Sequence, residues 1–242
     1  MKIIYLFIIL IISLYYVDAR GYAVYPRSRQ AFCADNRKNN FFYPLDGSGI
    51  KDPACRKAWR ESGPKFVMRK NEYTVYVPHY KMGINALQAQ VPRYLCSAGD
   101  VYKSGNSIPN IWTATVISVP YQSLEGERIN YKYCETSITR NHESNLWEFY
   151  ITEPGFNIDK QTLTWDDLIM FYNVTNILPE EQQETNEYCP TGTLYKIPIT
   201  LPVRYERATL LVRYQSTDLR GKCEISCSDY LFKPILRKKL LK

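Results

Sequence analysis

The sequence predicts an all-β protein built as an antiparallel β-sandwich, and three observations indicate this fold class. The 242 residues include 21 tyrosines, and threonine, valine and isoleucine recur in short runs that favour strands. Glycine, proline and asparagine separate these runs in the manner of turns between strands. Few stretches have a helical period, and the strands recur at a spacing typical of a sandwich.

The first 19 residues have the pattern of a secretory signal peptide. Lys2 precedes an apolar run over 3–14, and Val17-Asp18-Ala19 supplies a small-residue cleavage site. The run is too short to span a bilayer comfortably. We therefore predict a signal peptide over 1–19 and a secreted mature chain that begins at Arg20. The alternative is a buried N-terminal helix, but nothing amphipathic follows the run.

One domain over 20–232, followed by a basic tail over 233–242, is the simplest organisation of the remaining chain. We find no linker, internal repeat or second apolar stretch long enough for a transmembrane segment. The formal charge is +7, and the basic residues are spread out except near the C-terminus. A spread excess is typical of a solvated surface, so we expect no nucleic-acid binding, whereas anionic matrices or membrane surfaces stay open as partners.

The strand-like segments follow one another through the second half of the chain. Between 36 and 90 the chain is irregular, apart from a short helix over 52–62, where Asp52 is a suitable N-cap and Pro53 fits the first turn. A long irregular segment in a compact domain is often functional. The predicted strands cover 113–120, 128–134, 146–152, 195–202 and 208–216.

Seven cysteines behind a signal peptide indicate an oxidising compartment. Because seven is odd, at least one thiol is unpaired or pairs between chains. Sequence alone leaves the connectivity open, since six cysteines already allow 15 pairings. Asn173-Val174-Thr175 is an acceptor sequon, so we predict glycosylation at Asn173 of a secreted chain.

Several blocks resemble a known family in the same order along nearly the whole mature chain. They begin with GYAVYPRSRQAFC at 21–33, DGSGIKDPACRKAW at 46–59 and RKNEY at 69–73. They continue with LCSAGD at 95–100, RNHESNLWEFYITEPGFN at 140–157, LTWDDL at 163–168 and SCSDYLF at 226–232. Together they resemble the fusolin- and spindolin-like chitin-binding type-4 proteins, the family that contains the lytic polysaccharide monooxygenases.

The resemblance implies an immunoglobulin-like β-sandwich with a large loop-and-helix insertion after the first strand. It also implies a flat chitin-binding face with a copper ion at its centre. In the family, the N-terminal amine, the ring of the first histidine and a second histidine hold this copper, which suits its preference for nitrogen ligands in a plane.

The copper ligands are incomplete in this sequence. His142 matches the second histidine of the family, but Arg20 stands where the first histidine should be. A guanidinium stays protonated and offers no lone pair to a metal. Arg140 replaces a small residue two positions before His142. We therefore expect at most weak metal binding by His142 with the Arg20 amine, and no copper cofactor.

Two carboxylates complete the vestigial site that the resemblance implies. Glu72 matches a glutamate of the family, and Glu224 replaces an axial aromatic residue. We expect ion pairs between these carboxylates and Arg20 or Arg140 to fill the former copper site. The alternative is a new zinc site formed by the N-terminal amine, His142 and Glu224.

The resemblance also implies disulfide pairs and surface residues. It suggests the pairs Cys33–Cys55 and Cys96–Cys227, which leaves Cys134 and Cys189 for each other and Cys223 over. Alternatively, Cys223 pairs and another cysteine is free. Candidate chitin contacts on the insertion are Tyr43, Trp59 and Phe66, each with core packing as its alternative. We expect Trp112, Trp147 and Trp165 to be structural.

Three functions compete on this sequence. The first is a secreted, non-catalytic binder of chitin or a related polysaccharide that helps to cross a chitinous matrix, as fusolin-like viral virulence factors are thought to do. The second is a monooxygenase with an altered copper site, against which Arg20 argues. The third is an interaction or assembly protein on the same fold, with self-association through Cys223 and the basic tail.

Overall fold

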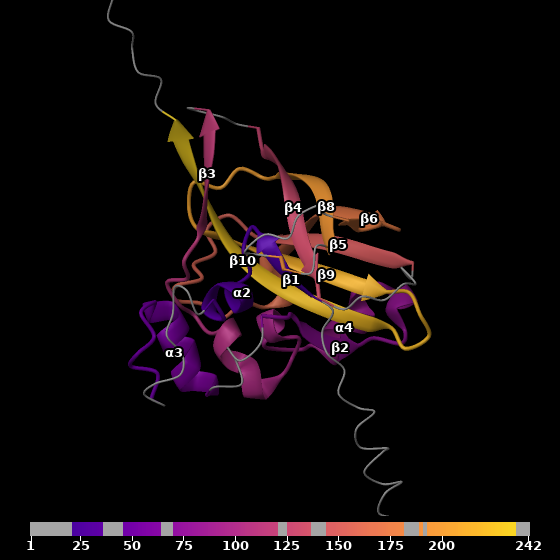
Figure 1. The fold of residues 1–242 in the computed structure, drawn as a ribbon, viewed down its shortest axis with the longest axis horizontal. Helices are drawn as coiled ribbons and strands as arrows, with labels where there is room; N and C mark the ends of the chain where they lie inside the picture. Colours follow the sequence, from indigo (N-terminus) through magenta and orange to yellow (C-terminus); the bar gives the residue numbers. More distant parts are fainter. Residues whose placement is uncertain are drawn as a thin grey trace, which may run out of the picture.

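The protein is a β-sandwich with a helical insertion packed against one side (Figure 1). The computed structural model describes residues 21–35, 46–63, 70–120, 125–136, 144–181, 189–190 and 193–235. Predicted site residues Arg20, Tyr43, Phe66, Arg140 and His142 lie outside these ranges, as do the predicted signal peptide and the end of the basic tail.

Two sheets form the sandwich. The first has the strand order β1-β4-β8-β7, with β1 at Gly21–Tyr25, β4 at Glu127–Glu135, β8 at Thr193–Leu201 and β7 at Glu180–Glu181. The second has the order β2-β10-β9-β5-β6, with β3 paired to β10 beside this path. Its strands are β2 (Tyr73–Tyr76), β3 (Thr115–Pro120), β5 (Asn145–Thr152), β6 (Leu168–Thr175), β9 (Ala208–Ser216) and β10 (Lys222–Ile235).

The predicted fold class is confirmed, and each predicted strand lies within two residues of an observed one. One pairing departs from the antiparallel pattern, because β3 runs parallel to the last six residues of β10, Tyr230 to Ile235. This pairing extends to Pro120 and Ile235, so the first three residues of the predicted tail, 233–235, belong to the sheet. Within the described residues, no helix is long and apolar enough to cross a membrane.

Aromatic side chains fill the space between the two sheets. Trp147 is fully buried, and the ring of Phe149 meets that of Tyr131 edge to face with centroids 5.2 Å apart. Tyr133 and Tyr214 also contact the Trp147 ring. The prediction that Trp147 is structural is therefore confirmed, and the many tyrosines of the sequence are largely core residues.

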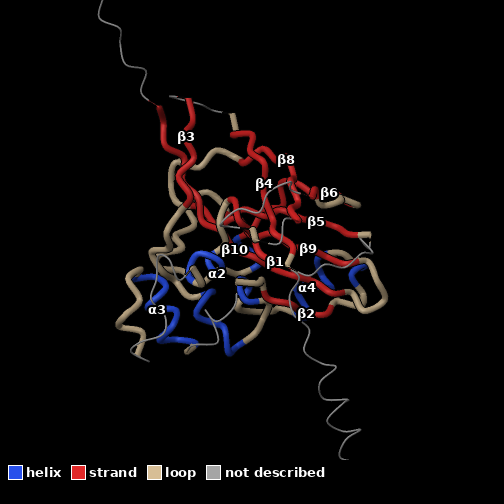
Figure 2. Tube along the Cα trace, viewed as in Figure 1, coloured by secondary structure: helices blue, strands red, loops and turns tan. Residues whose placement is uncertain are grey.

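The insertion between β1 and β3 carries most of the helical structure (Figure 2). Its helix α3 begins where the sequence predicts, since the Asp52 side chain accepts a hydrogen bond from the Cys55 amide and Pro53 occupies the first turn. Its helices and 3-10 turns are α2 (Arg29–Cys33), α3 (Pro53–Ser62), η2 (Tyr80–Met82), α4 (Ile84–Gln90), η3 (Leu95–Ser97) and η4 (Val101–Ser107), while η5 (Trp165–Asp167) lies between β5 and β6.

A buried ion pair ties the insertion to the sheet. The Arg29 guanidinium of α2 donates to both carboxylate oxygens of Asp229 on β10, at 2.7 and 2.8 Å. The guanidinium also donates to the Asn106 carbonyl and the Thr209 hydroxyl, and its central carbon lies 4.7 Å from the centroid of the Trp112 ring. Because every part of this pair is buried and bonded, it fixes the insertion on the outer face of β10.

Three disulfides reinforce the same arrangement. They join Cys33 to Cys55, Cys96 to Cys227 and Cys134 to Cys189, which are the pairs that the resemblance implies. The first holds α2 against α3, and the second holds η3 against β10. Cys223 has no disulfide and is fully buried beneath the insertion.

Candidate functional site: a buried carboxylate pair beside the first strand

The start of β1 brings the first described residue next to Glu72. The Glu72 amide donates to the Gly21 carbonyl at 2.7 Å, and Gly21 pairs with Glu135 of β4. Gly21 approaches β4 so closely that a Cβ there would overlap the Cys134 carbonyl. Only glycine allows this approach, because it has no Cβ. The start of β1 therefore lies beside Glu72.

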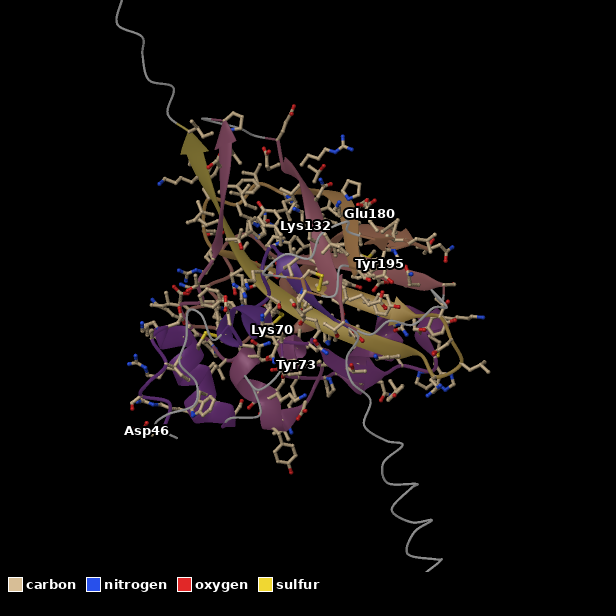
Figure 3. The ribbon with its side chains drawn as sticks, in the orientation of Figure 1. Asp46, Lys70, Tyr73, Lys132, Glu180 and Tyr195 are labelled. Atoms are coloured by element: carbon tan, nitrogen blue, oxygen red, sulfur yellow. A yellow bond between two sulfur atoms is a disulfide. The ribbon has the colours of Figure 1, made fainter. Side chains whose placement is uncertain are left out.

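Glu72 is buried and keeps its proton more tightly than an exposed glutamate. Its Oε1 accepts a hydrogen bond from the Ala23 amide at 2.8 Å. Burial raises the pKa of Glu72 to about 8, and the negative charge of Glu224 adds to the rise, while the Ala23 amide opposes it. Glu72 lies in the chain between Lys70 and Tyr73, which are labelled in Figure 3. The hydroxyl of Tyr73 donates a hydrogen bond to the Gln30 side chain.

Glu224 is the second carboxylate of the site, and both of its oxygens are engaged. It lies on β10 opposite Thr74, two residues from Glu72, and is 1 % exposed. Oε1 is 2.9 Å from the Lys222 ammonium, and Oε2 accepts a hydrogen bond from the Tyr133 hydroxyl. Burial, followed by the nearby charge of Glu224, raises the pKa of Tyr133, so the phenol stays a proton donor.

Sequence reasoning missed Lys222, the cation that this structure pairs with Glu224. The predicted partners were Arg20 and Arg140, which lie outside the described residues. A usable signal was present, because residues two apart on a strand share a face, and Lys222 precedes Glu224 by two. The Lys222 side chain is only 10 % exposed, which makes this a nearly buried ion pair.

The donor set of the described residues does not fit copper. A copper site requires accessible lone pairs, and it requires the absence of a competing cation. Here the Lys222 ammonium lies on one oxygen of Glu224 and the Tyr133 phenol bonds the other, so a metal ion at this carboxylate would compete with both partners. Among the described residues, no group of three or more His, Cys, Asp or Glu side chains could hold a metal ion.

Trp59, one of the three predicted chitin contacts, is corrected by the structure. Its side chain is only 5 % exposed and packs in the core of the insertion against Gly47. A ring buried in the core of the insertion cannot stack on a polysaccharide. Tyr43 and Phe66 lie outside the described residues. Trp112 is buried, and the Trp165 indole donates to the Val91 carbonyl, so both are structural as expected.

The insertion exposes a different aromatic side chain. Tyr102 of η4 is 69 % exposed and stands beside Val101, which is 50 % exposed. The turn that carries it is held by Asp100, whose side chain accepts from the Tyr102 amide at 2.9 Å. Its neighbour Lys103 lies over the Tyr73 ring at 4.5 Å, which links this turn to the strand that follows Glu72.

Comparison with known proteins finds relatives over most of the chain. The profile of a family described as lytic polysaccharide mono-oxygenase, cellulose-degrading, matches residues 21–230. Spindolin of Choristoneura biennis entomopoxvirus is 31 % identical over 254 aligned residues, which cover 93 % of this chain and 72 % of spindolin.

Two solved structures support the same relationship. The fusolin of Anomala cuprea entomopoxvirus spindles superposes with a TM-score of 0.79 at 26 % identity, covering 90 % of this chain and 92 % of that one. An entomopoxvirus fusolin in complex with zinc superposes with a TM-score of 0.76 at 29 % identity, covering 90 % and 78 %. The latter is described in connection with enhanced virulence and in vivo crystallization into viral spindles. These superpositions confirm the immunoglobulin-like sandwich that the resemblance implies.

Proposed function

Because the chain belongs to the lytic polysaccharide monooxygenase family, we propose that it is an extracellular polysaccharide-binding protein that has lost copper-dependent oxidation. One observation carries the proposal: Glu224 is held by Lys222 and Tyr133 at the position where the resemblance implies an axial aromatic residue beside the metal. Chitin is the polysaccharide that we expect, from the resemblance to fusolin-like proteins.

Charge and donor chemistry support the loss of the copper reaction. A chelate of amine and imidazole cannot form at Arg20, because a guanidinium has no free lone pair. Lys222 adds a positive charge next to the one carboxylate that could have replaced a ligand. An active copper enzyme with an altered ligand set is therefore the less favoured alternative, and it would depend on His142 and the Arg20 amine.

Adsorption to a polysaccharide needs no metal, because flat surfaces bind through aromatic rings and polar groups. Tyr102 is the side chain that we assign to this contact, since it is the most exposed aromatic residue among those described and lies on the insertion. The buried ion pair of Arg29 and Asp229 would keep this surface rigid.

Secretion and virulence belong to the same proposal. Three disulfides favour an oxidising compartment, and the predicted signal peptide over 1–19 provides the route. We assign the protein a function in weakening or crossing a chitinous matrix, as the virulence enhancement attributed to entomopoxvirus fusolin suggests.

Self-association is a second candidate, which the crystallization of entomopoxvirus fusolin into spindles favours. It cannot proceed through Cys223 as the sequence suggested. That thiol is fully buried, and burial raises its pKa to about 12 despite the Arg213 guanidinium beside it. A buried and protonated thiol forms no disulfide with another chain without unfolding.

The test is a chitin pull-down of the secreted protein with and without a chelator. We expect binding that the chelator leaves unchanged and that falls several-fold in Tyr102→Ala. Tyr205→Ala is the matched control, because Tyr205 is 45 % exposed but lies outside the insertion. Binding that disappears with the chelator would contradict the proposal.

The catalytic half is tested with copper and a reductant. The natural protein should release no oxidised oligosaccharides, whereas the triple variant Arg20→His, Arg140→Ala and Glu224→Phe should recover copper binding and some release. If the natural protein already oxidises chitin and the triple variant adds little, the proposed loss of activity is wrong.

A further inference from the structure

A groove opens between β4 of the smaller sheet and β3 of the larger one (Figure 1). It begins where β1 stops covering β4, since β1 pairs only with the second half of β4, from Lys132 to Glu135. Its volume of about 390 Å³ lies within the range of about 300–1,000 Å³ that small-ligand sites have. The residues that line it are Tyr25, Val116, Ile117, Ser118, Glu127, Arg128, Ile129, Asn130 and Lys132.

The alternation of side chains along β4 decides which of them face solvent. Ile129 and Tyr131 are 9 % and 0 % exposed, so they point into the sandwich. Arg128, Asn130 and Lys132 therefore share the outer face, where Arg128 and Asn130 are exposed and Lys132 is half-buried. At about 3.3 Å per residue, the two cations lie about 13 Å apart along the strand, with the amide of Asn130 between them.

The two cations of this row form no ion pair with any residue that the structure describes. The neighbouring strand provides the contrast, because Lys196 of β8 lies opposite Lys132 and is held by Glu180 at 2.6 Å. Two uncompensated cations along one concave surface favour an anionic ligand. The planar guanidinium of Arg128 suits a carboxylate or a sulfate in particular, since it can donate two parallel hydrogen bonds.

The groove also contains one carboxylate and two hydroxyl groups. Glu127 shares the inward face of β4 with Ile129, so it lies on the other side of the strand from the two cations. Burial, followed by the negative charge of Glu127, raises the pKa of Tyr25, which lies opposite Lys132 in the ladder and keeps its phenol proton. Ser118 is exposed on the wall that β3 forms. The lining therefore supplies neutral hydrogen-bonding groups beside its positive charge.

We propose that this groove binds an acidic polysaccharide, with Arg128 and Lys132 on its carboxylate or sulfate groups and Asn130 and Ser118 on its hydroxyl groups. A concave site of this volume admits a single extended chain, whereas the flat surface of a bilayer does not enter it. The row of side chains follows β4, so charged groups spaced along the ligand meet the two cations in turn. Tyr102 is not among the lining residues, and the inference is independent of the proposed chitin binding.

The probe is dextran sulfate, and neutral dextran is the matched polymer, because the two differ only in their charged groups. Affinity electrophoresis of the secreted full chain measures binding at low and at physiological salt. We expect binding to dextran sulfate that weakens as salt rises, since exposed charges are screened, and no binding to dextran. The double variant Arg128→Gln, Lys132→Gln should weaken the binding about tenfold, because it removes two exposed charge contacts.

Three further variants separate the groove from the overall positive charge. Lys81→Gln, Arg220→Gln is the matched control, since it removes the same net charge at two exposed residues outside the groove, and it should change affinity less than about twofold. Asn130→Asp keeps the shape of the side chain but places a carboxylate between the two cations, so it should also weaken binding about tenfold. Glu127→Gln removes the opposing carboxylate and should strengthen binding about twofold.

Equal losses in the two double variants would mean a general attraction between a basic protein and a polyanion, and would overturn the inference. Equal binding to dextran and dextran sulfate would overturn it as well. Chitin pull-down of Arg128→Gln, Lys132→Gln should match that of the natural protein, and a loss there would assign the groove to the neutral polymer instead. Circular dichroism of each variant shows whether lost binding reflects a lost fold; if the double variant does not fold, Asn130→Asp decides the outcome alone.

Discussion

Replacing Lys222 by methionine tests the ion pair that fills the site. Methionine keeps the length and apolar contacts of the side chain but removes the ammonium 2.9 Å from Glu224. Glu224 would then retain the Tyr133 hydroxyl while remaining near the second buried carboxyl, Glu72. The substitution therefore removes the cation that the described residues place beside this buried carboxylate.

The expected magnitude follows from the burial of the pair. Breaking a buried ion pair by removing one partner costs about 3–5 kcal/mol of unfolding free energy. We expect about 3 kcal/mol, the lower end, because the Lys222 side chain keeps 10 % of its exposure while Glu224 keeps 1 %.

The assay is urea unfolding at pH 7 with intact disulfides, followed by tryptophan fluorescence. Lys222→Arg keeps the charge and should lose less than half as much as Lys222→Met. The double variant Lys222→Met, Glu224→Gln removes both charges and should recover much of the loss. Lys196→Met is the matched control, because Lys196 pairs with Glu180 at 2.6 Å but both side chains are well exposed. Its expected cost is below about 1 kcal/mol. Equal small losses for Lys222→Met and Lys196→Met would refute the reasoning.

Two further predictions concern the groups around this site. Asp229→Asn leaves the buried guanidinium of Arg29 uncompensated and should cost about 3–5 kcal/mol in the same unfolding assay; Asp159→Asn, at a partly exposed pair with Arg207, should cost less than about 1 kcal/mol, and equal costs would contradict the prediction. The pKa of Glu72 is raised from its ordinary value of 4.5 to about 8 in the folded chain. Between these two pH values the folded chain keeps this proton, whereas the unfolded chain has released it. Stability should therefore fall as pH rises between these values, by at most about 1.4 kcal/mol per pH unit, and Glu72→Gln should remove this slope. An unchanged slope in unfolding measurements from pH 5 to 9 would count against it.

The sequence alone determined the fold class and much of its framework. Short runs rich in tyrosine, threonine, valine and isoleucine between turn residues located the strands, since these side chains favour extended structure. Asp52 and Pro53 marked the start of α3, because capping is a local interaction. The order of the family blocks implied the three disulfides, and Arg20 in place of a histidine indicated a changed metal site.

The tertiary structure decided what depends on contacts between distant segments. It selected Lys222 as the partner of Glu224, and it placed Glu72 against Gly21 and Ala23. It also buried Trp59 and Cys223, which the sequence offered as a surface contact and an intermolecular thiol. Composition and spacing report which residues can be buried or charged, whereas burial and pairing are set by which strands become neighbours, and that is a property of the folded chain.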